Sequence, residues 1–322
     1  MRKRTAVAPT MMVAALAVLD PFAFFQPTLQ FGAVERQSLL RGSAIARTVP
    51  APDGNVGIVA TVPVRIEPDR LVAWIRNIAA LKRSPAVRQI GRFSETPSLA
   101  DLSELTLDRV DLDDLARCRP SDCDVKLRPD EILRLRAAVD AAGRSKAARD
   151  VAVDAAFRTL VVARAEAYLR HGLSDGPEPP AFLGSNWPQL AEQVRSFPRG
   201  RPASSESFLY WSKDAYAGKP IISITHVTIV RGTRITEPEV LVIGRQVFAT
   251  HYTDGAWSFT SLVRDDQATY LVYVNQSAVD LLNTWYGGLV RRTVEGRIRS
   301  EAVEVLGGLK RRLESGDPPP LA

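Results

Sequence analysis

The fold is decided by residues 56–74, which read Val56-Gly-Ile-Val-Ala-Thr-Val-Pro-Val-Arg-Ile66 and then Glu67-Pro-Asp-Arg-Leu-Val-Ala-Trp74. Apolar side chains recur at every second position from Val56 to Ile66, a period typical of a strand with one buried face. Pro68, with an acidic residue on either side, suits the first turn of a helix. Apolar residues then repeat at intervals of three and four, namely Leu71, Trp74, Ile75 and Ile78. We therefore expect this helix to pack an apolar stripe against a sheet.

The last third of the chain predicts further strands and one long helix. β-Branched and aromatic residues dominate five stretches, and turn residues separate them. These predicted strands are Phe208–Ser212, Ile221–Val230, Val240–Tyr252, Trp257–Val263 and Tyr270–Val274. An amphipathic helix is expected from about Leu289 to Leu313. Residues 316–322, with three consecutive prolines, are expected to be a disordered tail.

Between residues 98 and 200 the pattern is helical. A long helix is expected from about Ser145 to His171, with Gly172 as its C-cap. Four aspartates precede it at positions 108, 111, 113 and 114. Because they lack the regular oxygen spacing and the loop glycine of a calcium loop, they indicate a solvated helix face. We interpret residues 98–200 as a helical insertion between the residue 34–97 part and the strand-rich residue 201–315 part of one α+β domain.

The N-terminus has the pattern of a secretory leader. Arg2, Lys3 and Arg4 precede an apolar run from Ala6 to Leu19, which is too short to span a bilayer comfortably. We assign residues 1–33 to a signal peptide. Its end is approximate, because Ala17, Ala23 and Ala33 are each candidate cleavage positions. The alternative is an uncleaved anchor. The sequence thus predicts a periplasmic or secreted protein, with no stable membrane span once the leader is removed.

The only two cysteines, Cys118 and Cys123, lie in Cys-Arg-Pro-Ser-Asp-Cys. Pro120 and Asp122 favour a turn that brings the two sulfur atoms within bonding distance. An oxidising compartment then favours a structural disulfide bond. A zinc half-site or a redox pair is the alternative, but zinc needs further ligands, and redox cysteines are usually two residues apart at the start of a helix. No metal site is expected.

Composition narrows the class of partner. Hydrophobic residues make up 45% of the 322 residues and charged residues 24%, which is ordinary for a globular protein. The net charge is +6, but three positive charges belong to the leader and the others are interleaved with acidic residues. We therefore expect no nucleic-acid partner. The sequence identifies no protein partner.

The strand-rich part carries the candidate site residues. A set of aromatic and histidine side chains falls on its predicted strands: Tyr210, Trp211, His226, His251, Tyr252, Trp257 and Tyr273. Polar groups on an apolar sheet face are candidate anchors in a ligand cavity. Either histidine could instead be an ordinary core residue whose ring nitrogens are bonded to backbone or to tyrosine hydroxyls.

Catalytic and cofactor motifs are absent from the sequence. It contains no Gly-x-Ser-x-Gly elbow, no phosphate loop and no dinucleotide fingerprint. No cofactor is therefore expected. A hydrolase with His226 or His251 as general base stays open, because a catalytic triad is defined by geometry that a sequence does not show.

The order of these elements resembles the helix-grip superfamily, which includes START lipid-transfer and polyketide cyclase-like domains. The resemblance covers roughly residues 55–93 and 206–314: an opening strand, the helix that begins Glu67-Pro68-Asp69, antiparallel strands and a long C-terminal helix. The chain also resembles a group of uncharacterised exported bacterial proteins. The superfamily resemblance implies a curved antiparallel sheet wrapped on the last helix, with a cavity between them for an apolar or lipid-like small molecule.

Three functions follow as hypotheses. The first is binding of an apolar or lipid-like small molecule in the helix-grip cavity, lined by the seven candidate residues. The second is hydrolysis with one of the two histidines as base. The third is a non-catalytic envelope interaction protein that uses the helical insertion as a docking surface.

Overall fold

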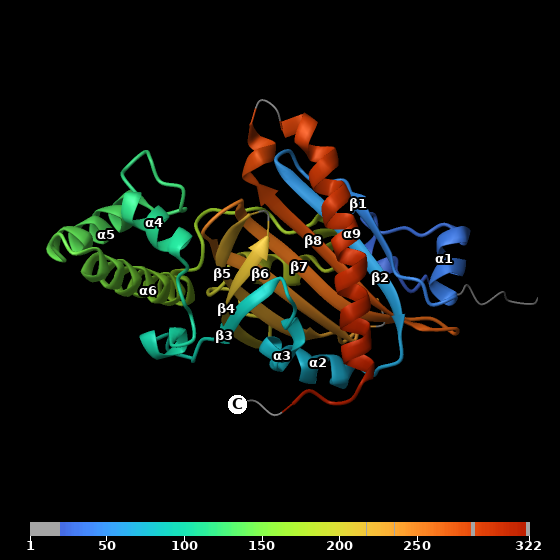
Figure 1. Ribbon diagram of the computed structural model, residues 1–322. Coiled ribbons are helices and arrows are strands. Elements are labelled where there is room, and N and C mark those ends of the chain that lie inside the picture. Colours follow the sequence, from blue (N-terminus) through green and yellow to red (C-terminus); the bar gives the residue numbers. More distant parts are fainter. Residues whose placement is uncertain (1–19, 217, 235, 285–286, 320–322) are drawn as a thin grey trace, which may run out of the picture.

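The computed structural model describes residues 20–216, 218–234, 236–284 and 287–319, which contain one antiparallel sheet of eight strands. Its strands are β1 (Ile45–Val49), β2 (Asn55–Val64), β3 (Val87–Arg92), β4 (Glu206–Tyr216), β5 (Lys219–Arg231), β6 (Val240–Ala249), β7 (Thr253–Arg264) and β8 (Thr269–Val279). They lie in the order β1-β2-β8-β7-β6-β5-β4-β3, so the early strand β2 pairs with the last strand β8 (Figure 1). The predicted α+β class with a curved antiparallel sheet is confirmed.

The helices on one face of the sheet follow from the apolar stripe in residues 68–78. Helix α2 (Pro68–Arg76) has proline in its first turn, and α3 (Ile78–Lys82) follows it directly. The stripe residues are buried in one cluster with side chains of the central strands, among them Val227 and Val242. We call this side of the sheet face A.

The long helix α9 (Gly287–Glu314) also lies on face A. It packs against β1 and β2 and approaches α2, and the other strands lie to one side of it (Figure 1). Leu306 and Leu313 are buried in the same cluster as the α2 stripe. The arrangement of a curved sheet on a long C-terminal helix is therefore confirmed, although the helix covers the early strands more than the late ones.

The opposite side, face B, is covered by the chain between β3 and β4. This connection contains the helices α4 (Arg109–Arg117), α5 (Pro129–Ala141), α6 (Lys146–His171), α7 (Ala181–Asn186) and α8 (Pro188–Arg195). Helices α4, α5 and α6 share a buried cluster with Trp211 and Ile224, whereas α7 and α8 pack with Phe259. The buried Lys213 of β4 also points to this side, where its Nζ lies 2.7 Å from Asp111 Oδ2 of α4.

The predicted leader extends into the folded core. Residues 1–19 lie outside the described residues, but Phe22, Phe25 and Leu29 are buried on face B together with α7 and α8. The ring of Phe25 lies 5.2 Å from that of Phe182, centroid to centroid. A leader that ended at residue 33 would remove this aromatic cluster, and one that ended before Asp20 would leave it in place. After it, α1 (Ala33–Leu40) leads into β1.

No helix among the described residues is long and apolar enough to cross a membrane.

Part of the expected tail contacts α2. The indole N–H of Trp74 donates to the carbonyl of Gly316 over 3.1 Å, and the Asn77 amide donates to the carbonyl of Pro319 over 2.6 Å. Residues 316–319 are therefore tethered, and residues 320–322 lie outside the described part.

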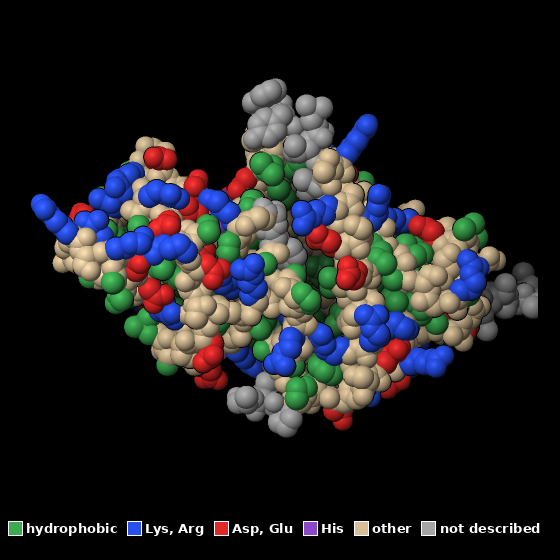
Figure 2. Space-filling model, viewed as in Figure 1, with side chains coloured by type: hydrophobic (Ala, Val, Ile, Leu, Met, Phe, Trp, Pro, Cys, Tyr) green, Lys and Arg blue, Asp and Glu red, His purple; other side chains and the backbone are tan. Residues whose placement is uncertain are grey.

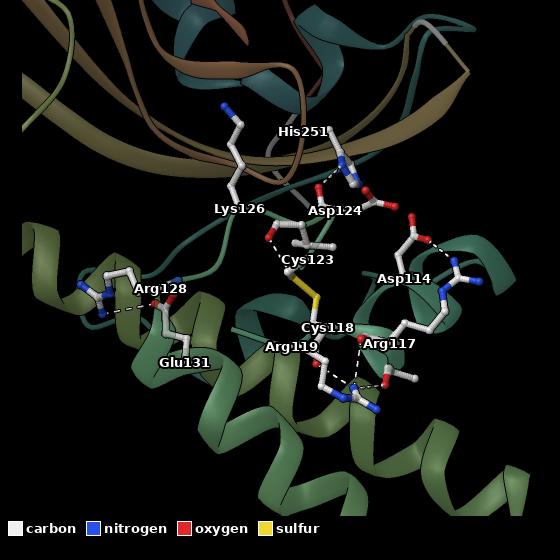
Figure 3. The surroundings of a disulfide bond; sticks show 12 residues. Asp114, Arg117, Cys118, Arg119, Cys123, Asp124, Lys126, Arg128, Glu131 and His251 are labelled. Carbon is white, nitrogen blue, oxygen red and sulfur yellow. Dashed lines mark hydrogen bonds and ion pairs between the residues drawn. A yellow bond between two sulfur atoms is a disulfide. The ribbon is translucent and has the colours of Figure 1, made fainter. Parts of the chain in front are cut away.

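The predicted disulfide bond is confirmed. Cys118 and Cys123 are joined over 2.02 Å directly after α4 (Figure 3). The chain then returns to the sheet, where the Lys126 amide donates to the carbonyl of Thr250 over 3.0 Å. The Lys126 ammonium pairs with Asp254 and Asp280 at the same end of the sheet. The disulfide turn thus connects the insertion to the ends of β6, β7 and β8.

The N-terminal aromatic cluster predicts a large stability effect. Phe25→Ala should lower the free energy of unfolding by about 3–5 kcal/mol, because the side chain is fully buried and its removal leaves a cavity. Val34→Ala is the matched control, since Val34 is 78% exposed. Urea unfolding of both variants measures the difference. Equal stability of the two would show that the N-terminal segment is not part of the core.

Candidate functional site

The structure divides the seven predicted site residues among three places. Because neighbouring residues of a strand point to opposite faces, Tyr210 lies on face A and Trp211 on face B. His226 and Trp257 also lie on face B, and Tyr273 lies on face A. His251 and Tyr252 follow the end of β6, outside both faces. One pocket lined by all seven therefore does not form.

On face B, His226 is an almost fully buried residue. Its Nδ1 lies 2.8 Å from the Tyr168 hydroxyl of α6, and its ring centroid lies 4.4 Å from that of Phe197. Its Nε2 is buried without a hydrogen-bond partner among the described residues. Burial lowers the pKa of His226 to about 3, and the positive charges of Arg245 and Arg201 act in the same direction.

The two tryptophans of the predicted set pack rather than line an open space. Trp211 Nε1 donates to the carbonyl of Asp101 over 2.8 Å, and Trp257 Nε1 to the carbonyl of Pro177 over 2.7 Å. A Cβ atom at Gly91 on the neighbouring strand would lie only 2.6 Å from Trp211 Nε1, so the glycine makes room for the ring. Both indole N–H groups therefore bind backbone carbonyls of the connection between β3 and β4, which covers face B.

The cavity beside His226 and Trp257 is small. Its volume is about 10 Å³. Sites for drug-sized ligands usually have several hundred cubic ångströms. This cavity cannot hold the apolar or lipid-like ligand that the sequence predicts.

His251 connects the disulfide turn to the sheet. Its Nδ1 lies 3.0 Å from the carbonyl oxygen of Asp124, as Figure 3 shows. Burial and the nearby Lys219 ammonium lower the pKa of His251. The adjacent Tyr252 has a φ of 67°, and its hydroxyl accepts from the Lys219 amide over 3.3 Å. Among the described residues, His226 thus bonds a tyrosine hydroxyl and His251 a backbone carbonyl, rather than the serine and carboxylate of a triad.

Face A carries a polar cluster that the sequence reasoning missed. Lys82 Nζ, at the end of α3, donates to the Tyr210 hydroxyl over 2.9 Å. On the same strand, Ser212 Oγ donates to Asp214 Oδ2 over 2.9 Å and lies 3.2 Å from Ser223 Oγ of β5. The alternation Tyr210, Ser212, Asp214 was visible in the sequence, but nothing in it placed Lys82 beside these residues.

The ionisable groups of this cluster have shifted pKa values. Burial raises the pKa of the Asp214 carboxyl, and this is partly offset by the charge of Lys82 and the Ser212 hydrogen bond. Burial lowers the pKa of Lys82, but the neighbouring Tyr210 and Asp214 outweigh it and hold that pKa above its usual value. Asp214 Oδ1 is buried without a hydrogen-bond partner among the described residues. The cluster thus combines a cationic donor with a carboxyl group that binds its proton more tightly than usual.

Partly exposed side chains extend this polar surface across the sheet beside α9. Along each strand they alternate with residues of face B. They are Thr225, Gln246, Ser258, Thr260, Tyr273 and Asn275. Figure 2 shows this side of the molecule, with a hollow beside the middle of α9. Apolar side chains of α2 and α9 border the same face. Face A therefore offers an open surface with a polar floor and an apolar edge.

Two further observations describe ligand-binding capacity. An open depression of about 420 Å³ lies at the start of α2, and it is lined by the charges of Arg65, Glu67, Asp69, Arg70 and Asp317. In the part of the chain that the structure describes, no group of three or more histidine, cysteine or acidic residues is arranged to hold a metal ion.

Comparison with known proteins adds little. No protein-family model and no curated protein matches the sequence. Among solved structures, the chain is similar to the crystal structure of the protein TTHA0849 from Thermus thermophilus, with a TM-score of 0.28 and 14% identity. That match covers 41% of this chain and 86% of the other. So low a TM-score carries no argument, and the resemblance to the helix-grip superfamily stays a prediction.

The lowered pKa of His226 predicts a pH dependence of stability. Below pH 6.5 this histidine binds a proton in the unfolded chain, but folded His226 stays neutral down to about pH 3. The free energy of unfolding should therefore fall as the pH falls through this window. The slope from this one group is about 1.4 kcal/mol per pH unit. His226→Gln should flatten the curve between pH 6 and pH 4, measured by urea unfolding.

The control for this prediction is His171→Gln, because His171 lies exposed at the end of α6. This variant should keep the slope of the unaltered protein. Parallel curves for both variants would contradict the assignment of the acid sensitivity to His226.

Proposed function

We propose that the protein binds a small amphipathic molecule on face A, with the polar head of the ligand at Lys82 and Asp214. The observation that carries the proposal is the buried Asp214 Oδ1, which lacks a hydrogen-bond partner among the described residues. Buried polar atoms are nearly always hydrogen-bonded, so such an atom marks a place where a ligand group would be stabilised.

The chemistry of the cluster favours a carboxylic acid or a similar oxygen-bearing head group. The Lys82 ammonium would donate to a ligand carbonyl or carboxylate oxygen, as a charge-assisted hydrogen bond. Asp214, with its raised pKa, would exchange a hydrogen bond with the second oxygen of the head group. Ser212 holds the carboxyl of Asp214 from one side, and Ser223 in turn lies within hydrogen-bond distance of Ser212.

The body of the ligand would lie along the open part of face A. Tyr273 and Ile90 are partly exposed there, and Leu306 of α9 belongs to the bordering apolar cluster. The proposal keeps the hypothesis of an apolar or lipid-like ligand between the sheet and the last helix. Its polar anchor, however, is Lys82 and Asp214 rather than a histidine. The disulfide bond is compatible with an exported protein, and we propose a periplasmic or secreted location.

Binding measurements on single variants test the proposal. We expect a fluorescent long-chain fatty acid to bind the unaltered protein, and Lys82→Met to weaken its binding about 10-fold or more, because a hydrogen bond to a charged group is lost. Asp214→Asn should weaken binding less, since the amide can still form one hydrogen bond. Lys146→Met is the matched control, because the Lys146 side chain is 72% exposed on the helical insertion.

A second variant tests the position of the ligand body. Thr260→Trp puts a large side chain on the partly exposed floor and should block binding, whereas Gln267→Trp in the exposed turn after β7 should not. Affinities of the Lys82, Asp214 and Thr260 variants equal to that of the unaltered protein would contradict the site. Absence of binding by fatty acids and aromatic acids alike, in native mass spectrometry, would remove the proposed function.

A further inference from the structure

The small cavity on face B is closed by the chain that follows α8. Its wall includes Gln193, Gly200, His226, Thr228, Arg245 and Trp257. The space of about 10 Å³ is close to the minimum for one water molecule, so a monatomic ion is the largest ligand that it could take. It lies on the opposite side of the sheet from the Lys82 cluster, so a ligand in this cavity is independent of the proposed function.

Hydrogen-bond donors converge on this cavity. Burial raises the pKa of the Tyr168 hydroxyl, and the positive charge of the nearby Arg245 guanidinium opposes this shift. The Tyr168 hydroxyl lies 2.8 Å from His226 Nδ1, and the nearby positive charge favours the orientation in which the hydroxyl oxygen faces Arg245 and its proton faces Nδ1. The proton of the neutral imidazole then resides on Nε2, the buried nitrogen without a partner among the described residues. The arrangement therefore favours His226 as a donor into the cavity.

The charge of Arg245 is offset by carbonyl groups and an aromatic ring. Arg245 is only 8% exposed, and it donates hydrogen bonds to the carbonyls of Val194 and Arg195, over 3.4 and 3.3 Å. Its guanidinium carbon also lies 4.9 Å from the centroid of the Trp257 ring. Carbonyl dipoles and an aromatic face balance a buried positive charge only in part.

We propose that this cavity binds a single monatomic anion, chloride under physiological conditions, between His226 and Arg245. The anion accepts the Nε2 proton of His226 and balances the buried guanidinium. Water would satisfy the hydrogen bond but not the charge. Anions with several atoms, such as sulfate or methanesulfonate, exceed the available space.

Anion binding to the folded state alone raises stability by mass action. Thermal unfolding is measured while chloride replaces methanesulfonate at constant ionic strength. We expect the Tm to rise by about 2–4 °C for each tenfold increase in free chloride above its Kd. Crystals grown in sodium bromide should show an anomalous peak within hydrogen-bond distance of His226 Nε2.

Matched variants separate the cavity from the general effect of salt. Arg245→Met removes the buried charge and should abolish the chloride response. Arg199→Met removes an exposed charge from the connection after α8, beside the cavity, and should preserve the response. If Arg245→Met does not fold, the bromide crystals of the unaltered protein decide. A Tm that is the same in chloride and methanesulfonate, or a cavity without bromide, would overturn the proposal.

Discussion

The alternation of side chains along the central strands governs the rest of the molecule. Each strand of the single sheet sends neighbouring residues to opposite faces, so both faces need their own cover. On β4, Trp211 and Lys213 point to the helical insertion, and Tyr210 and Asp214 point to α3. Lys213 binds the insertion to the sheet through Asp111 and Asp108, and loss of this lysine would leave the buried Asp111 carboxylate without its cation.

Periodicity was enough to predict the helices and strands, but not which of them pack against each other. The strand and helix of residues 56–78, the long helix ending at His171 and the disulfide bond followed from local patterns. Whether a strand residue lies on one face or the other follows from its odd or even position along the strand. Which helix covers that face, however, depends on contacts between residues far apart in the sequence. The predicted site therefore mixed residues of both faces, and Lys82, 128 positions before Tyr210, carried no signal.

The N-terminal segment shows that an apolar stretch of sequence can be interpreted either as a leader or as part of the core. Phe22, Phe25 and Leu29 follow a basic, apolar start and look like its continuation in the sequence. In the fold they are core residues that fill the space between face B and α7. Composition cannot distinguish an apolar segment that enters a membrane from one that enters a protein core, since both are driven by removal of apolar surface from water.

The two polar sites differ in the sign of their charge, and this difference separates their ligands. Around Lys82 the positive charge faces the Asp214 carboxyl, so a polar head that both donates and accepts suits the site. Around His226 the nearby charges are those of Arg245 and Arg201, both positive, and the histidine is neutral over most of the pH range. Arg201 is exposed, but Arg245 is buried, and a buried positive charge needs a compensating anion or strong dipoles. The carbonyl groups at the end of α8 accept from Arg245 only over 3.3 to 3.4 Å, so their dipoles offset its charge weakly. A bound anion would therefore add to the stability of face B.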